Sequence, residues 1–425
     1  MAPITATSTV ATVTVVVDTT PPLASAGAMM DPTAGTVDIG TGFNKTVDGA
    51  SGSLPSNYSI SSGTITSFTW RFNRFTADSQ NPLVMVRKQS ALLRVTGFSG
   101  SGTVTVKNVK DSYGNQIITT NVPVTVASNL TWGVVGANEL GGWNAAVPVG
   151  PGAFDVYSDG YAEWGTYDET TFIYQQVTGD FDKKLRVQYQ DDSSEWARAG
   201  IIARDVLNLG VDQATQTGSG NTAPPYDGTA GRYQKCHVNP VGPCLTGPGT
   251  AANASWEGNR RLDTGGASTT CLTNVNATPL YPNAWCRLQR RGQTFSIFRS
   301  DDGVNWELLG QTVWGQDDQT LTPMPATVYV GPEYSPENGN ITLAADQGTF
   351  LAQFRDYGDY SAVTQPTLTV TRNADGTFTL TYTGTLYSSA TANGTYSPVS
   401  GAASPFQVNP KANGAAAAMF YRAEQ

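Results

Sequence analysis

Acidic side chains stand in adjacent pairs that could bind a cation. The pairs are Asp191 and Asp192, Asp301 and Asp302, and Asp317 and Asp318. Calcium takes about six to eight oxygen ligands, mostly carboxylates and carbonyls on loops. None of the pairs has the spacing of an EF-hand. The pairs therefore predict one calcium ion at loops, with a solvated turn as the alternative at each pair.

The same acids are also candidates for catalysis. Glycoside hydrolysis needs two carboxylates about 5 to 9 Å apart, and the chain has no alternating E-x-D-x-x-E strand. The nearest cluster, Asp191 and Asp192 with Glu195, lies beside a turn. A Ser–His–Asp triad would have to use His237, the single histidine. No G-x-S-x-G elbow or phosphate-binding Gly-rich loop occurs. We therefore predict that the protein is not an enzyme.

Aromatic side chains offer a second chemistry, because sugar rings stack on exposed Trp and Tyr faces. Candidates for a glycan surface stand in Gly-rich or polar stretches: Trp164, Tyr167, Trp256 and Trp314. Trp196, Trp285 and Trp306 lie within strand patterns and are expected in a core.

The four cysteines are Cys236, Cys244, Cys271 and Cys286. Four cysteines allow three disulfide pairings. The local pairing is preferred, Cys236 with Cys244 and Cys271 with Cys286, because each pair brackets a Pro- or Asn-rich turn. A zinc site is disfavoured, since no C-x-x-C spacing occurs. Disulfides form in oxidising compartments, so we expect an extracellular or cell-surface protein.

Composition sets the frame for these residues. The chain has 425 residues, 45 Gly, 24 Pro and only 14% charged residues, which favours strands and turns over helices. A net charge of −9 argues against a nucleic-acid partner. No apolar run is long enough to span a membrane.

Residues 1–18 contain a long alternating run at 4–17, with Val13, Val15 and Val17 on one face. Three interpretations stay open. The run is the last strand of a preceding domain, a donor strand that pairs with a neighbouring subunit, or a first edge strand. The second would make the protein a homo-oligomer or filament.

Residues 19–127 show strand-like runs about every ten residues, separated by turn signals, which is typical of an immunoglobulin-like sandwich. The segments DTTPP at 18–22 and VKDSYGN at 109–115 resemble those of bacterial Ig-like domains of surface and S-layer proteins. That resemblance implies a spacer or stalk.

Residues 128–362 carry FIYQQVTGDF at 172–181, WARAGI at 196–201, and WCRLQRRG at 285–292. These segments resemble the concanavalin-like, laminin-G-like jelly rolls of secreted bacterial proteins. That resemblance implies a lectin-like domain. The polar stretch 208–283 is an insertion and is expected to be a long loop braced by disulfides.

Residues 363–425 predict a small β-domain, with a hairpin around Asn373 to Gly376. The sequence thus predicts an all-β protein made of an Ig-like sandwich, a concanavalin-like jelly roll and a C-terminal β-module. The expected function is structural and adhesive, with a glycan or other surface ligand as partner. The alternative is a carbohydrate-binding module or part of a carbohydrate-active enzyme.

Overall fold

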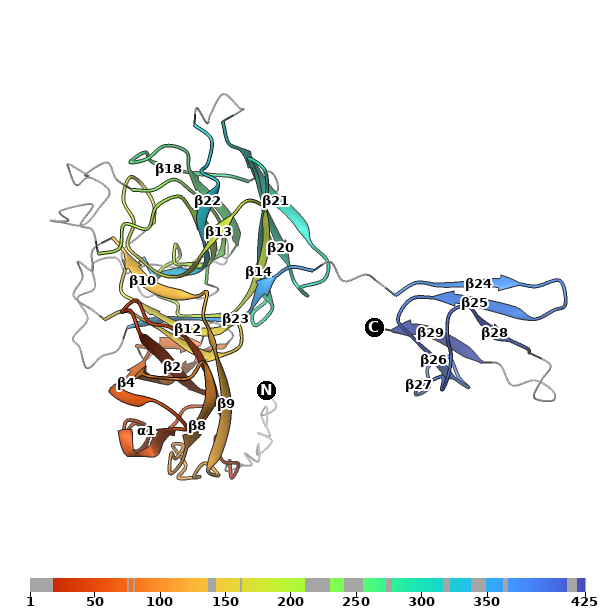
Figure 1. The fold of residues 1–425 in the computed structure, drawn as a ribbon, viewed down its shortest axis with the longest axis horizontal. Coiled ribbons are helices and arrows are strands. Elements are labelled where there is room, and N and C mark those ends of the chain that lie inside the picture. Colours follow the sequence, from red (N-terminus) through yellow and green to blue (C-terminus); the bar gives the residue numbers. More distant parts are fainter. Residues whose placement is uncertain are drawn as a thin grey trace, which may run out of the picture. The chain divides into compact units, whose positions relative to one another are not determined.

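The computed structural model describes residues 18–74, 76–78, 81–136, 143–160, 163–210, 230–240, 255–272, 277–315, 322–337, 349–361, 366–410 and 419–424. The predicted strand at 4–17, with Val13, Val15 and Val17, lies outside this range and stays a prediction. The chain divides into two compact units, Met1–Tyr360 and Ser361–Gln425. Strands form nearly all of the regular structure, so the all-β prediction is confirmed (Figure 1). In the described part, no helix is long and apolar enough to cross a membrane.

Sheet 1 has seven strands in the order β3-β8-β9-β1-β2-β7-β4. Its strands are β1 (Ala24–Met30), β2 (Thr36–Phe43), β3 (Tyr58–Ile60), β4 (Thr64–Phe72), β7 (Gln89–Thr96), β8 (Ser101–Val106) and β9 (Thr120–Ala127). The short helices α1 (Gly49–Gly52) and η1 (Pro55–Asn57) precede β3, and β5 (Thr76–Asp78) pairs with β6 (Asn81–Val86). Strand β7 shows why the sheet forms: Leu93 and Val95 enter its core, while Leu92 on the other face packs against residues of sheet 3.

Sheets 2 and 3 also have seven strands each. Sheet 2 runs β10 (Thr131–Val135), β13 (Thr170–Thr178), β22 (Thr327–Ser335), β15 (Arg198–Arg204), β16 (Tyr233–Val238), β17 (Trp256–Arg261) and β18 (Ser268–Thr270). Sheet 3 runs β11 (Ala145–Gly150), β12 (Ala153–Ser158), β23 (Phe350–Asp359), β14 (Phe181–Gln190), β19 (Ala284–Arg291), β20 (Thr294–Ser300) and β21 (Glu307–Val313). Both sheets contribute to one large apolar core, including Ile201 and Val330 from sheet 2 and Leu185 and Leu288 from sheet 3.

The prediction of a long loop at 208–283 is wrong for part of that stretch. Strands β16, β17 and β18 lie inside this stretch and extend sheet 2 at one edge. Their sequences, YQKCHV, WEGNRR and STT, are mostly polar, so they show no clear apolar alternation. What looked like an insertion therefore carries three of the sheet's strands.

The second unit has two small sheets. The first contains β24 (Leu368–Arg372), β25 (Phe378–Tyr382) and β28 (Phe406–Val408), and the second β27 (Ser397–Pro398), β26 (Thr385–Ser389) and β29 (Phe420–Glu424). The predicted hairpin is confirmed, because β24 and β25 pair antiparallel and Gly376 takes a φ of 82° in the turn.

Sheet 1 lies tightly against sheet 3. A Cβ placed on Gly40 of β2 would stand 2.2 Å from the Pro148 carbonyl oxygen of β11, and one on Gly27 of β1 would stand 2.6 Å from the Gly150 nitrogen. Such distances leave no room for a side chain. Glycine at both positions therefore lets the two backbones touch.

Candidate functional site

Strand β16 turns a row of polar side chains away from the core. Cys236 and Val238 point into the apolar core between sheets 2 and 3. Successive strand residues face opposite sides, so Tyr233, Lys235 and His237 lie on the outer face of sheet 2. All three are fully buried.

The Lys235 ammonium lies at ion-pairing distance from the carboxyl groups of both Glu163 and Glu333, and all three side chains are fully buried. Burial and the negative charge of Glu333 raise the pKa of Glu163 to about 8. Glu163 therefore holds a proton at neutral pH, and the Lys235 side chain lies against both acidic side chains.

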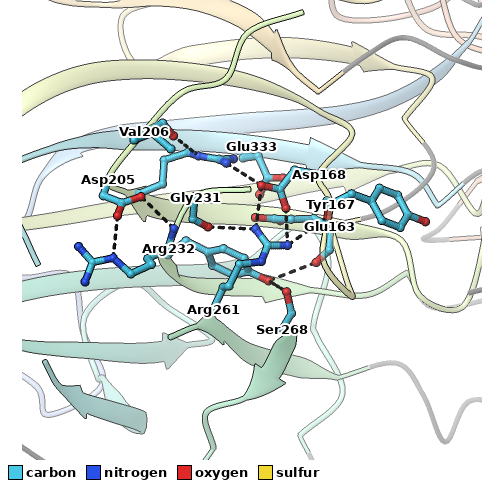
Figure 2. Close-up of polar contacts among 12 residues, drawn as sticks. Glu163, Tyr167, Asp168, Asp205, Val206, Gly231, Arg232, Arg261, Ser268 and Glu333 are labelled. Atoms are coloured by element: carbon cyan, nitrogen blue, oxygen red, sulfur yellow. Dashed lines mark hydrogen bonds and ion pairs between the residues drawn. The ribbon is translucent and has the colours of Figure 1, made fainter. Parts of the chain in front are cut away.

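A second buried group centres on Asp168. It accepts hydrogen bonds from Arg204 Nη2 at 2.6 Å and from Arg261 Nη1 at 2.9 Å. Burial alone would raise the pKa of Asp168, but the two guanidinium groups outweigh it and lower the pKa to about 2. Arg261 also donates to the Tyr167 carbonyl oxygen at 3.1 Å (Figure 2). The loop that carries Glu163 and Asp168 is thereby fixed to sheet 2.

His237 lies beside this network and pairs with Glu257, with Nε2 and Oε2 3.2 Å apart. Burial lowers the pKa of His237 to about 4, against the opposing effect of Glu257. The imidazole is therefore neutral at physiological pH. It serves as a hydrogen-bonding partner of a strand carboxylate.

We call these six side chains the buried ion network: Glu163, Asp168, Arg204, Lys235, Arg261 and Glu333. A carboxylic acid beside a carboxylate is the pair that glycoside hydrolysis uses. Each of the six side chains, however, has a solvent-exposed fraction of 0%. In this state a substrate cannot reach them, and their geometry anchors the 163–168 loop.

An open cavity lies elsewhere, where sheets 1 and 3 meet. It has a volume of about 480 Å³. We call it the cleft, and its lining includes Phe43, Lys45, Lys88, Gln188, Gln353 and Arg355. Among the described residues that line it, none is Asp or Glu. The cleft thus presents cations and amides on a protein whose net charge is −9.

Hydrogen bonds hold the walls of the cleft in place. The Arg355 guanidinium donates to Asp155 at 2.9 Å, and Gln353 donates to the same carboxylate at 3.1 Å. The Lys88 ammonium lies 4.4 Å from the centre of the Tyr189 ring. In the described part of the chain, no ion pair joins Lys88 to a carboxylate. Lys88 is therefore the cleft cation most available to a ligand.

The structure gives the predicted calcium ligands other tasks. Asp191 accepts hydrogen bonds from Asn73 Nδ2 and from the Leu351 backbone N–H, each at 2.8 Å, which ties sheet 1 to sheet 3. Asp192 next to it is buried. No group of three or more acidic, His or Cys side chains suited to a metal occurs among the described residues.

Asp302 caps its own turn, accepting from the Val304 and Asn305 backbone N–H groups at 2.8 Å. Asp301 beside it is exposed. Asp317 and Asp318 lie outside the described residues, where calcium binding stays a prediction. Asp191 thus serves a contact between sheets and Asp302 a turn, and calcium binding by the acidic pairs stays a prediction.

Three of the four proposed glycan-binding aromatics are buried. Trp256 lies on the inward face of β17 and donates its indole N–H to the Trp285 carbonyl oxygen at 3.1 Å. Trp314 packs on Phe295 in the same core, and Tyr167 is buried in the loop above sheet 2. Trp164 is half-buried, with the Arg198 guanidinium 5.8 Å from its ring centre.

Conversely, the expectation that three tryptophans fill the core is wrong. Trp196 is 41% exposed. Trp285 and Trp306 are half-buried on the outer face of sheet 3, where their rings meet edge to face. Neighbouring Ala284 and Cys286 take the inward positions on β19. The strand pattern identified the strand but not the register.

The cysteines also differ from the prediction. Cys236, Cys271 and Cys286 are buried and form no disulfide in the structure, so the predicted Cys271–Cys286 bond is not present. The Cys271 thiol lies 3.4 Å from the Gln311 carbonyl oxygen on β21, whereas Cys286 lies on β19 beside Cys236. Cys244 lies outside the described residues. Sequence proximity misled here because strand β20 lies between β19, which carries Cys286, and β21, which Cys271 contacts.

Comparisons with known proteins give little for this chain. No protein-family model and no curated protein matches it. A protein of unknown function from Saccharomyces cerevisiae is similar in structure, with 15% identity, a TM-score of 0.34, and coverage of 55% of this chain and 97% of the other. A mutant of the GH43 protein BlXynB from Bacillus licheniformis shows 12% identity, a TM-score of 0.32, and coverage of 77% and 64%.

Proposed function

We propose that the protein is an extracellular adhesive protein that binds a glycan in the cleft between sheets 1 and 3. The observation that carries the proposal is the cleft itself, an open cavity of about 480 Å³ lined by amides and cations. Ligand sites typically have about 300 to 1,000 Å³. The cleft is thus large enough for a sugar ring or two.

The lining fits the chemistry of a sugar. Gln188, Gln353 and Asn44 carry amides, which both donate to and accept from hydroxyl groups. Phe43 offers an apolar ring face. Lys88 and Arg355 add positive charge, which favours glycans that carry carboxylates, such as those with uronic acids.

Binding without turnover is part of the proposal. Glycoside hydrolysis requires two carboxylates on either side of the bond, and no carboxylate lines the described cleft. The acid pair of Glu163 and Glu333 is closed to solvent. The cleft therefore supports recognition, and the buried ion network supports the scaffold that carries it.

A binding screen tests this proposal. Purified protein is applied to neutral and uronic-acid-containing oligosaccharides, and hits are measured by calorimetry. We expect Lys88→Glu to weaken glycan binding about tenfold or more, because it replaces a cationic side chain of the cleft with an anionic one. Lys107→Glu is the control, since Lys107 is exposed on the far end of sheet 1 and does not line the cleft. Failure of every glycan to bind, or equal binding by both variants, would overturn the proposal.

Assembly through residues 4–17 is a separate part of the proposal, supported by the alternating pattern that includes Val13, Val15 and Val17. Electron microscopy of the full chain beside a variant lacking residues 1–17 tests it. Filaments only in the full chain support strand donation. Identical particles in both samples would reject it and leave glycan binding untouched.

A further inference from the structure

Two cysteines face each other across the core between sheets 2 and 3. Cys236 lies on β16 and Cys286 on β19, and both side chains are fully buried. The two strands belong to opposite sheets. Both cysteines occupy inward positions, Cys236 between Gln234 and Val238 and Cys286 between Ala284 and Leu288.

Hydrogen bonds and strand register place the two sulfur atoms together. The Cys236 thiol donates to the Phe298 carbonyl oxygen on β20 at 3.4 Å. Cys286 pairs in register with Arg299, the residue directly after Phe298. The Cys236 sulfur therefore reaches across the core to the strand that adjoins Cys286. The two thiols also interact with each other directly.

Strands β16 and β19 lie closer together than facing sheets usually do. Cα atoms of β16 and β19 approach within 8 Å, whereas facing sheets usually lie about 10 Å apart. A disulfide needs Cα atoms within about 7 Å and Cβ atoms that face each other. Gly258, the register neighbour of Cys236 on β17, has no side chain to hold the sheets apart.

We propose that Cys236 and Cys286 form a disulfide that joins sheets 2 and 3. Each thiol loses a proton, the two sulfur atoms form one S–S bond, and two electrons pass to the oxidant. The oxidant is a second disulfide, either oxidised glutathione or a thiol–disulfide oxidoreductase, which becomes two thiols. Because both sulfurs are buried in the folded protein, the exchange takes place while the chain folds.

Cys271 does not fit this bond. Cys271 points toward β21, where its thiol lies 3.4 Å from both the Gln311 carbonyl oxygen and the Thr312 hydroxyl. In a cell the bond requires an oxidising compartment, so its presence there rests on the proposed extracellular location. In a defined redox buffer the geometry alone decides the outcome.

The test uses the full chain with Cys244→Ser and Cys271→Ser, which leaves only the two facing thiols. The chain is refolded in buffers that contain oxidised and reduced glutathione, then denatured and treated with a thiol-alkylating reagent. We expect no alkylation, and a mass about 2 Da below that of the reduced chain because two hydrogen atoms are lost. Two alkylated cysteines after refolding in excess oxidised glutathione would overturn the proposal.

A second measurement keeps the test decisive if that variant does not fold. The unchanged protein is digested with trypsin and chymotrypsin, which cut between Cys271 and Cys286 after Trp285. A Cys286 fragment linked to the Cys236 fragment, and absent from Cys236→Ser, supports the bond. A Cys286 fragment recovered only as free thiol, or linked to Cys271, rejects it. Glycan binding is not part of either readout.

Discussion

The buried ion network and the cleft are both rich in charge, but they differ in how the charge is compensated. Lys235 of the network contacts two carboxyl groups and has no exposed surface. Lys88 of the cleft rests on an aromatic ring and lines an open cavity. A buried charge is tolerated only when it is paired, whereas an open cation can exchange water for a ligand. The network therefore holds the fold, and the cleft is where we propose that a partner binds.

Removal of the central cation should break this contrast most strongly. Lys235→Met leaves Glu163 and Glu333 side by side without their shared ammonium. Loss of one partner of a buried pair costs about 3 to 5 kcal/mol, so the urea midpoint should fall sharply. Lys107→Met, at an exposed position, is the control and should change stability by less than about 0.5 kcal/mol. A midpoint that stays within error for Lys235→Met would contradict a structural role.

Acid should weaken the network through Asp168, whose folded pKa is lowered to about 2. A lowered carboxylate pKa contributes stability above the unfolded value near 3.8, and this contribution is lost as the pH falls toward 2. The loss from this group is about 2 kcal/mol. Between pH 5 and 2 the free energy of unfolding should fall less steeply for Asp168→Asn than for the unchanged protein. That variant starts from a lower stability. Parallel curves of stability against pH for the two proteins would show that another group causes the loss of stability in acid.

The contact between sheets 1 and 3 can be tested with one methyl group. Gly40→Ala places a carbon 2.2 Å from the Pro148 carbonyl oxygen, so the sheets must separate. Overpacking of this kind costs about 1 to 3 kcal/mol. Because the cleft lies at the same junction, glycan affinity should fall as well. Gly35→Ala is the matched control for contacts, since a Cβ there would meet nothing within 4 Å, although its positive φ adds strain of its own.

The last test measures how steeply stability changes with pH. The pKa of Glu163 is raised to about 8, so the folded state holds a proton that the unfolded state releases near pH 4.5. Stability should therefore decline as the pH rises from 4.5 to 8. Glu163→Gln, which stays neutral, should show a flatter profile over this window and equal glycan binding. A steeper decline in the variant would mean that Glu163 is ionised in the fold.

Much of the architecture could be predicted from the sequence. The apolar alternation of β7, β13 and β14, together with the turn at Asn373 to Gly376, indicated strands where the structure has them. Whether sheet 1 is an immunoglobulin-like sandwich and sheets 2 and 3 a jelly roll stays a prediction. Strands β16 to β18 were missed because most of their residues are polar or charged, and buried polar residues resemble a surface pattern in sequence.

The site was harder to predict than the fold. Asp191 looked like a cation ligand, but its partner Asn73 lies more than a hundred positions away in the chain. In the same way, the two partners of Lys235 come from a distant loop, which carries Glu163, and a distant strand, which carries Glu333. Pairing between remote segments leaves no local pattern. A Lys within an otherwise buried strand was the one available signal.

The glycine contacts at Gly27 and Gly40 also bear on how fast a ligand would bind. Backbones in direct contact restrict sliding between the two sheets, so we expect the cleft to keep one shape before and after binding. Association would then need no conformational step, and its rate would be set by diffusion and orientation. Differences in affinity between glycans should therefore appear as differences in how long each stays bound.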